Sequence, residues 1–222
     1  MRKLYEIFRN EKLTPLVSKL TWSHYLQLLS MKDINKIIFY INVCINQNLS
    51  KRELCEKIKN NEYERLDDST KEKLITKEET KVIDFVKNPI LIKNSMNYND
   101  IFEKILKQLI LEDLDNFLKE LGDGFSYIGN EYKIKIGDRY NYIDLLLFNY
   151  EYNCFVVIEL KITELKKEYI GQIEVYMNYI DKNIKTINQD KTIGIIICKK
   201  DNHFVMEYCS DNRILAREYN LV

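Results

Sequence analysis

Two apolar runs in the second half of the chain carry charged residues. The first, YIDLLLF at 142–148, has Asp144 near its centre, and the second, CFVVIELK at 154–161, ends in Glu159 and Lys161. A continuous apolar run of this length, bounded by polar residues, is typical of a buried β-strand. Burying a charged side chain costs free energy unless a partner or a bound ion offsets it. The pattern therefore predicts a site at these two strands.

The segment between the two runs, which includes Tyr150 and Asn153, is long enough for a hairpin loop but too short for a crossover helix. We therefore expect two antiparallel neighbouring strands. Because side chains alternate along a strand, Glu159 and Lys161 share one face, and Asp144 can approach Glu159 from the partner strand.

Two carboxylates and a backbone carbonyl, that of Leu160, would form an all-oxygen site suited to Mg²⁺ or Mn²⁺. Beside such an ion, Lys161 could hold the attacking water, favour its hydroxide form or neutralise charge on a phosphoryl group, as phosphodiester hydrolysis requires. The alternative is that Glu159 and Lys161 are a surface ion pair without function. If these two residues were the only evidence, we would prefer this alternative. The additional carboxylate of Asp144, within the neighbouring apolar run, favours a functional site.

The segment after Lys161 predicts an amphipathic helix. Its apolar residues recur at helical spacing, at Ile170, Ile173, Tyr176, Met177 and Ile180. Gln172 and Tyr176 lie four residues apart and so share one helix face, where Gln172 could orient a water or contact a phosphate. The alternative is that the Gln172 amide is solvated and that Tyr176 packs in the core. For Tyr176 we prefer this alternative.

The rest of the pattern predicts two domains. Residues 1–95 indicate a helical domain, with a capping box at Ser50 and Glu53, and Pro89 interrupts the helical pattern. In residues 96–222 we expect one helix over 101–121, ending at Gly122 and packing on a sheet. Strands are predicted at EYKIKI (131–136), the two charged runs, IGIIIC (193–198) and HFVMEY (203–208). This order predicts an α/β (α+β) fold, a mixed sheet flanked by helices after an all-helical N-terminal domain.

The first helix of the second domain also carries acidic residues. Glu120, beside the turn at Gly122, could supply a further carboxylate to a metal ion, although such residues more often face water.

Composition narrows the function classes. Lys plus Arg and Asp plus Glu are both 34, so no global basic field marks the chain as a DNA-binding protein. The five cysteines form no CxxC pair and are expected to be reduced, and two histidines make a zinc site improbable. The chain has no apolar run long enough to span a bilayer, and its first residues lack the apolar core of a signal peptide, so we expect a cytoplasmic protein.

The ordered set of motifs resembles the PD-(D/E)XK nuclease superfamily, with its restriction-endonuclease-like fold, and more narrowly the bacterial YhcG-type family, in which a helical domain of unknown function precedes the nuclease domain. The matching fragments are LTWSHYLQLL (20–29), Phe39 with Tyr40, KREL (51–54), YERL (63–66), ELGDGFSYIG (120–129), YIDLLLF (142–148), VVIELK (156–161), EYIGQIEVYMNYID (168–181) and IGIIIC (193–198). They cover nearly the whole chain in the family's order.

The resemblance implies that Asp144, Glu159 and Lys161 are the metal and catalytic residues and that Gln172 supports them. Two departures stand out. Asn130 and Glu131 replace the Arg-Gln common in the family, which removes a possible phosphate contact, and the superfamily's Pro-Asp is absent, as is usual in the narrower family. The chain is also expected to begin later than many relatives.

The first hypothesis is an endonuclease that uses Mg²⁺ or Mn²⁺ to cut DNA, and the resemblance adds the expectation of a homodimer. The alternative is a module that keeps the nuclease fold and binds nucleic acid or protein without cutting. A purely structural protein is a third reading, which the intact acid and lysine set disfavours. For the N-terminal domain, DNA contact and a dimer or partner interface both stay open.

Overall fold

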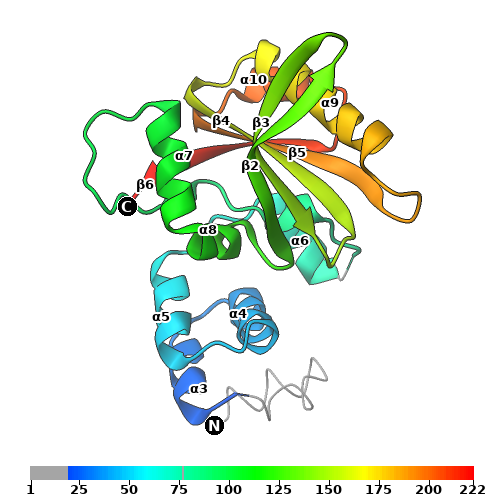
Figure 1. Cartoon of the computed structure of the whole chain (residues 1–222). Helices are drawn as coiled ribbons and strands as arrows, with labels where there is room; N and C mark the ends of the chain where they lie inside the picture. Colours follow the sequence, from blue (N-terminus) through cyan, green and yellow to red (C-terminus); the bar gives the residue numbers. More distant parts are fainter. Residues whose placement is uncertain (1–19, 77) are drawn as a thin grey trace. The chain divides into compact units, whose positions relative to one another are not determined.

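The structure is a computed structural model that describes residues 20–76 and 78–222 (Figure 1). The chain divides between Glu79 and Thr80 into two compact units. Among the described helices, none combines the length and apolar character that a membrane crossing requires.

The N-terminal unit is helical, as the sequence predicts. Its described helices are α3 (Trp22–Leu28), α4 (Ile34–Asn46), α5 (Lys51–Lys59) and α6 (Asp68–Thr76). Their core is built on Leu28, Tyr40, Ile41 and Leu54, each at most 1% exposed. Ser50 accepts a hydrogen bond from the Glu53 amide while the Glu53 carboxylate accepts one from the Ser50 amide, so the predicted capping box is present.

The second unit is built on a six-stranded mixed sheet. Its elements in chain order are η1 (Val82–Phe85), β1 (Ile90–Ile92), α7 (Glu103–Glu112), α8 (Leu114–Leu121), β2 (Phe125–Ile136), β3 (Arg139–Asn149), β4 (Cys154–Glu164), α9 (Lys167–Asn183), β5 (Asp190–Lys200), α10 (His203–Glu207) and β6 (Ile214–Leu221). The strand order is β1-β6-β5-β4-β3-β2. Strands β2, β3 and β4 pair antiparallel, whereas β4, β5, β6 and β1 run parallel.

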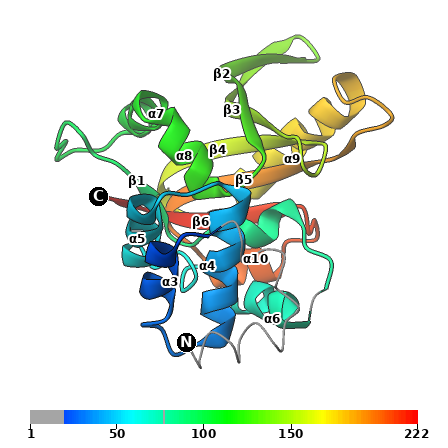
Figure 2. The ribbon, with the colours of Figure 1, turned by 90° about the horizontal axis from the view of Figure 1, so that it is seen from below.

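Helices cover both faces of this sheet (Figure 2). Helices α7 and α8 pack on one face through Leu106, Leu109 and Phe117, which join the buried strand residues Leu145 and Ile158. The other face packs on α9, with Ile173 and Met177 against Val157 and Ile196. Burial on both faces explains why the central strands are continuous apolar runs. The predicted fold class is confirmed.

Three predictions differ from the structure. Residues 80–95 belong with the second unit, because β1 pairs with β6 and so joins the sheet, whereas the predicted boundary lies at 95. The single helix predicted over 101–121 is two, interrupted at Asp113, whose φ of −126° and ψ of 45° lie outside the helical region. Residues 203–207 form the short helix α10 instead of a strand, because the Asn202 side chain accepts the Val205 amide and caps the first turn.

The last strand, β6, was missed because Arg217 and Glu218 interrupt its apolar pattern. Arg217 is nevertheless buried, and its guanidinium donates to the carbonyl oxygen of Val86 at 2.9 Å. The short strand β1 was missed as well, since three residues give no period to recognise.

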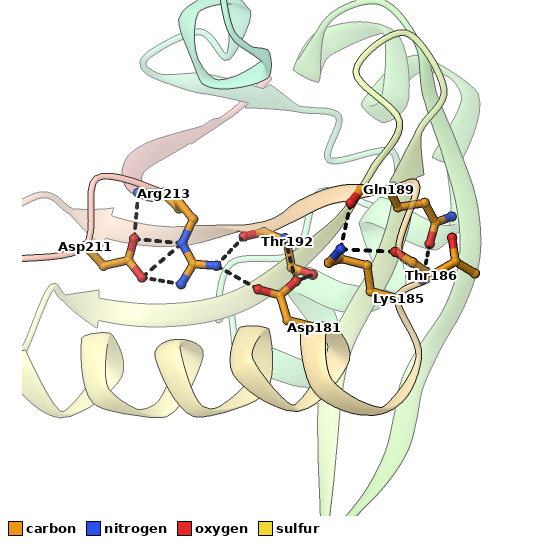
Figure 3. A network of polar contacts seen from close by, with 7 residues as sticks. All are labelled: Asp181, Lys185, Thr186, Gln189, Thr192, Asp211 and Arg213. Atoms are coloured by element: carbon orange, nitrogen blue, oxygen red, sulfur yellow. Dashed lines mark hydrogen bonds and ion pairs between the residues drawn. The ribbon is translucent and has the colours of Figure 1, made fainter.

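A polar network ties the end of α9 to the strands beside it (Figure 3). Arg213 donates to the carboxylates of Asp211 at 2.6 Å and Asp181 at 2.9 Å, and Asp181 also accepts from the amide and hydroxyl of Thr192. The hydrogen bonds from Arg213 lower the pKa of Asp211. Helix α9 is thereby held against the start of β5.

Candidate active site

The site forms where β3 separates from β4. Regular pairing ends at Leu145 opposite Ile158, so the next residues in register are Asp144 and Glu159. One carboxylate oxygen of Asp144, Oδ2, accepts a hydrogen bond from the Leu160 amide at 3.0 Å. The side chain of Asp144 thus occupies the gap between the strands, on the edge of β4 that the Leu160 backbone faces.

Glu159 is the most deeply buried acid of this group, with 2% of its surface exposed. Its Oε2 lies 3.3 Å from the Lys161 ammonium, and its Oε1 accepts the Asp144 amide at 3.5 Å, a long contact. Burial, with the nearby charge of Asp144, raises the pKa of Glu159 to about 7, although Lys161 opposes the rise. A cation bound at Glu159 would therefore replace a proton near neutral pH.

Lys161 is 8% exposed and keeps its charge. Burial by itself lowers the pKa of this amine, but the carboxylates of Glu159, Glu103 and Asp144 outweigh that cost, and the pKa is raised. The ring of Tyr169, in the first turn of α9, lies 5.3 Å from the ammonium. Both pKa values are raised, with opposite consequences for charge. At Glu159, burial and the charge of Asp144 outweigh Lys161 and disfavour the charged acid, whereas at Lys161 three carboxylates outweigh burial and favour the charged amine.

A second amine, Lys107 of α7, contacts the outer side of Asp144. Its Nζ lies 2.9 Å from Asp144 Oδ1 and 3.1 Å from Glu131 Oε1. Burial lowers the pKa of Lys107, but the hydrogen bond and charge of Asp144, aided by Glu131, raise it overall. Asn130 stands where the family commonly has an arginine, and Lys107 places a cation from another element beside the next residue, Glu131.

The donor set fits a hard divalent ion. Four carboxylates, those of Glu103, Glu131, Asp144 and Glu159, interact with only two amines, so the group has an excess of negative charge. In residues 20–76 and 78–222, no three His, Cys, Asp or Glu side chains form a ready-made metal cluster. An ion at Asp144 and Glu159 would therefore keep several waters, as Mg²⁺ commonly does.

The Leu160 carbonyl is placed to join this donor set. The amide of Leu160 points to Asp144, and in an extended strand the N–H and C=O of one residue face the same edge.

Two other predicted residues have different surroundings. The Glu120 carboxylate in α8 accepts the Leu91 amide at 3.0 Å, so it binds the edge strand β1. Gln172 donates to the Tyr176 hydroxyl at 3.0 Å, on the shared helix face that the sequence predicts. Tyr176 is 5% exposed, in agreement with a packing role.

The family model described as "YhcG PDDEXK nuclease domain" matches residues 83–222, more than half of the chain. The chain belongs to this family. A second model, "DUF1016 N-terminal domain", matches residues 1–65. The resemblance inferred from the motifs is thereby confirmed, and the boundaries of the family's nuclease domain agree with those of the second unit, which begins at Thr80.

A curated relative named "Putative nuclease YhcG", from Escherichia coli (strain K12), is 25% identical over 208 residues. The alignment covers 90% of this chain and 56% of that protein, so this chain spans little more than half the length of its relative.

Two solved structures are also similar. A repair endonuclease from Pyrococcus abyssi is 18% identical, covers 55% of this chain and 48% of its own, and has a TM-score of 0.38. An EndoMS-dsDNA2 complex is 19% identical, covers 56% of this chain and 48% of its own, and has a TM-score of 0.40.

Sequence reasoning missed Lys107, Glu103 and Tyr169 as members of the site. Glu103 and Lys107 are four residues apart on a helix predicted to pack on the sheet, so their shared face was readable. That this helix crosses the point where β3 leaves β4 depends on tertiary packing, which no local pattern encodes.

Proposed function

We propose that this protein is an endonuclease that hydrolyses phosphodiester bonds of DNA with the help of Mg²⁺ or Mn²⁺. One observation carries the proposal: Asp144 and Glu159 face each other where β3 and β4 part, with the Lys161 ammonium 3.3 Å from Glu159. Membership of a PDDEXK nuclease family supports the same reaction.

Asp144, Glu159 and the Leu160 carbonyl would hold the ion, which supplies a Lewis acid and makes its bound water more acidic. Lys161 is charged and fixed by Glu159, so it can orient the attacking water and stabilise negative charge that develops on the phosphoryl oxygens. Lys107 is close enough to Asp144 to approach the same phosphate from the α7 side. Gln172 is proposed as a supporting residue from the first half of α9.

The test is cleavage of supercoiled, linear and forked DNA with Mg²⁺, Mn²⁺ or a chelator. The wild-type protein is compared with Asp144→Asn, Lys161→Ala and the control Lys182→Ala, which removes an exposed lysine at the end of α9. We expect metal-dependent cutting by the wild type and the control, and a loss of at least 100-fold in the two site variants, on the order of the effect of removing one electrostatic catalytic group. Full activity in both site variants would reject the assignment.

A binding module without cleavage is the second candidate, and one observation favours it. The Lys107 ammonium already occupies Asp144 Oδ1, where it would compete with a cation. This reading requires that the wild-type protein binds DNA and leaves it uncut at every metal concentration.

The location and the assembly are also proposed. All five cysteines are free, which supports a reducing, cytoplasmic environment. A homodimer would supply two sites for the two strands of a duplex. Light scattering of the purified protein, alone and with DNA, tests this assembly.

A further inference from the structure

A row of lysine and tyrosine side chains extends from Asp144 along the β2–β3 hairpin. Lys133 pairs with Tyr142, and Lys135 pairs with Tyr140. Because alternate residues of a strand share a face, Tyr140 and Tyr142 lie on the same side of β3, and the two lysines lie opposite the tyrosines on that side. We call these two lysines and two tyrosines the hairpin face.

Side-chain contacts link the two strands of the hairpin at each end. Near the site, Lys107 contacts both Glu131 of β2 and Asp144 of β3, so these two carboxylates lie on one face. Farther out, the Lys133 ammonium lies 3.8 Å from the centre of the Tyr140 ring.

The hairpin face is exposed while the reverse side of the hairpin is anchored. Tyr140 and Tyr142 are 55% and 53% exposed. On the reverse side, Ile134 and Ile143 are 1% and 0% exposed and pack in the cluster that includes α9 residues. The hairpin extends from the rest of the sheet (Figure 2). The rings are therefore presented to solvent on a fixed support.

The chemistry of this face is that of a nucleic-acid surface. Lysine ammoniums bind phosphates, and exposed tyrosine rings stack on bases. A base in a duplex has its faces covered by its neighbours, so a ring lying on a sheet can stack only on an unpaired base. The hairpin face also lies close to the proposed site. Tyr140 and Asp144 are four positions apart along β3, which corresponds to about 13 Å at roughly 3.3 Å per residue.

We propose that the hairpin face binds unpaired nucleotides of DNA next to the phosphodiester bond to be cut. This inference rests on the proposed function and names its substrate class as DNA with a single-stranded part beside the cleavage point. The tyrosines supply the preference for unpaired bases, and the lysines supply affinity for the backbone.

Binding can be measured without cleavage, by fluorescence anisotropy of labelled oligonucleotides in the presence of a chelator. The probes are a single strand, a blunt duplex and a fork of matched sequence. We expect the double variant Tyr140→Ala/Tyr142→Ala to bind the single strand and the fork about 30-fold more weakly or worse, from about 1 kcal/mol or more for each of two stacked bases, with less than a 2-fold change for the duplex. Tyr140→Phe/Tyr142→Phe should restore binding, and Tyr208→Ala, which removes an 83% exposed tyrosine elsewhere, should not alter it.

The lysines are tested by salt dependence. Lys133→Ala/Lys135→Ala should weaken binding to all three probes and reduce the slope of log affinity against log salt by about 1.4 for the single strand, at roughly 0.7 per lost phosphate contact. The control Lys182→Ala should keep the wild-type slope. An unchanged slope in the double lysine variant would overturn the proposal.

Equal losses for single strand and duplex in the tyrosine variant, unchanged affinity in that variant, or no binding of single strands by the wild type would also overturn it. Failure of the proposed function has a different signature. A wild-type protein that prefers forked DNA through these tyrosines, but does not cut with any metal, would retain the hairpin proposal and reject hydrolysis.

Discussion

Replacing Glu159 with glutamine should stabilise the metal-free protein while removing its proposed ability to hold the ion. Glu159 is 2% exposed, and its pKa rises from an ordinary 4.5 to about 7. The folded protein therefore holds this proton more tightly than the unfolded chain. Stability falls as the pH rises from about 4.5 to about 7, and the full cost of the charge is present above that window.

The size of the effect follows from the pKa values. A rise from 4.5 to about 7 corresponds to a cost of about 3 kcal/mol at pH 8, at roughly 1.4 kcal/mol for each tenfold change in proton affinity. At pH 5 the same relation leaves a cost of about 1 kcal/mol. Glu159→Gln keeps the shape of the protonated acid and cannot ionise, so its advantage over the wild type should grow between these two pH values.

The assay must report on the second unit. The single tryptophan, Trp22, lies in α3 of the other unit, so its fluorescence does not follow the site. Amide hydrogen exchange of β4 and β5 peptides, corrected for intrinsic exchange at each pH, measures the stability of the strands that carry Glu159. The control Glu174→Gln removes an exposed carboxylate from α9.

The chelated protein is compared first, and saturating Mn²⁺ is then added. We expect the wild type to gain about 3 kcal/mol at 100 times the dissociation constant, and Glu159→Gln to gain little. A variant no more stable than the wild type at pH 8 without metal, or an advantage that does not change with pH, would refute the reasoning.

Three further changes separate the roles of neighbouring residues. Lys107→Ala should raise Mn²⁺ affinity several-fold by calorimetry, because it frees an oxygen of the proposed metal ligand, whereas the control Lys104→Ala on the same helix should not. Glu120→Ala should lower stability by about 1 to 3 kcal/mol in urea denaturation and leave Mn²⁺ affinity unchanged, since its carboxylate binds a partly buried strand amide; reduced metal affinity would contradict this role. Gly194→Ala should destabilise the protein by about 1 to 3 kcal/mol, because the added Cβ would lie 2.6 Å from the buried sulfur of Met177. Gly171→Ala adds a Cβ that meets no neighbour and should stabilise α9. Equal effects of the two substitutions on stability would exclude the packing argument.

Much of the second unit was predictable because its strands are buried on both faces. Continuous apolar runs marked β3, β4 and β5, and the short segment between the first two required a hairpin. The same apolar runs made Asp144 recognisable as a candidate site residue, since a charged residue is uncommon among buried aliphatic residues.

What the sequence could not provide depends on contacts between distant segments. Strand β1 is recognisable only by its pairing with β6, and the buried charge of Arg217 obscures β6 until its contact with Val86 is known. Lys107 joins the site because α7 packs on β4 and the lysine side chain reaches Asp144 of β3, although Lys107 and Asp144 are 37 positions apart in the sequence.

The central claim is that the two acids at the parting of β3 and β4 hold one divalent ion. A crystal structure with Mn²⁺, located by its anomalous scattering, tests it most directly. We expect one ion at roughly 2.0 to 2.3 Å from oxygens of Asp144 and Glu159 and from the Leu160 carbonyl, with waters completing its shell. Mn²⁺ bound elsewhere, with the Lys107 ammonium still on Asp144, would contradict the account.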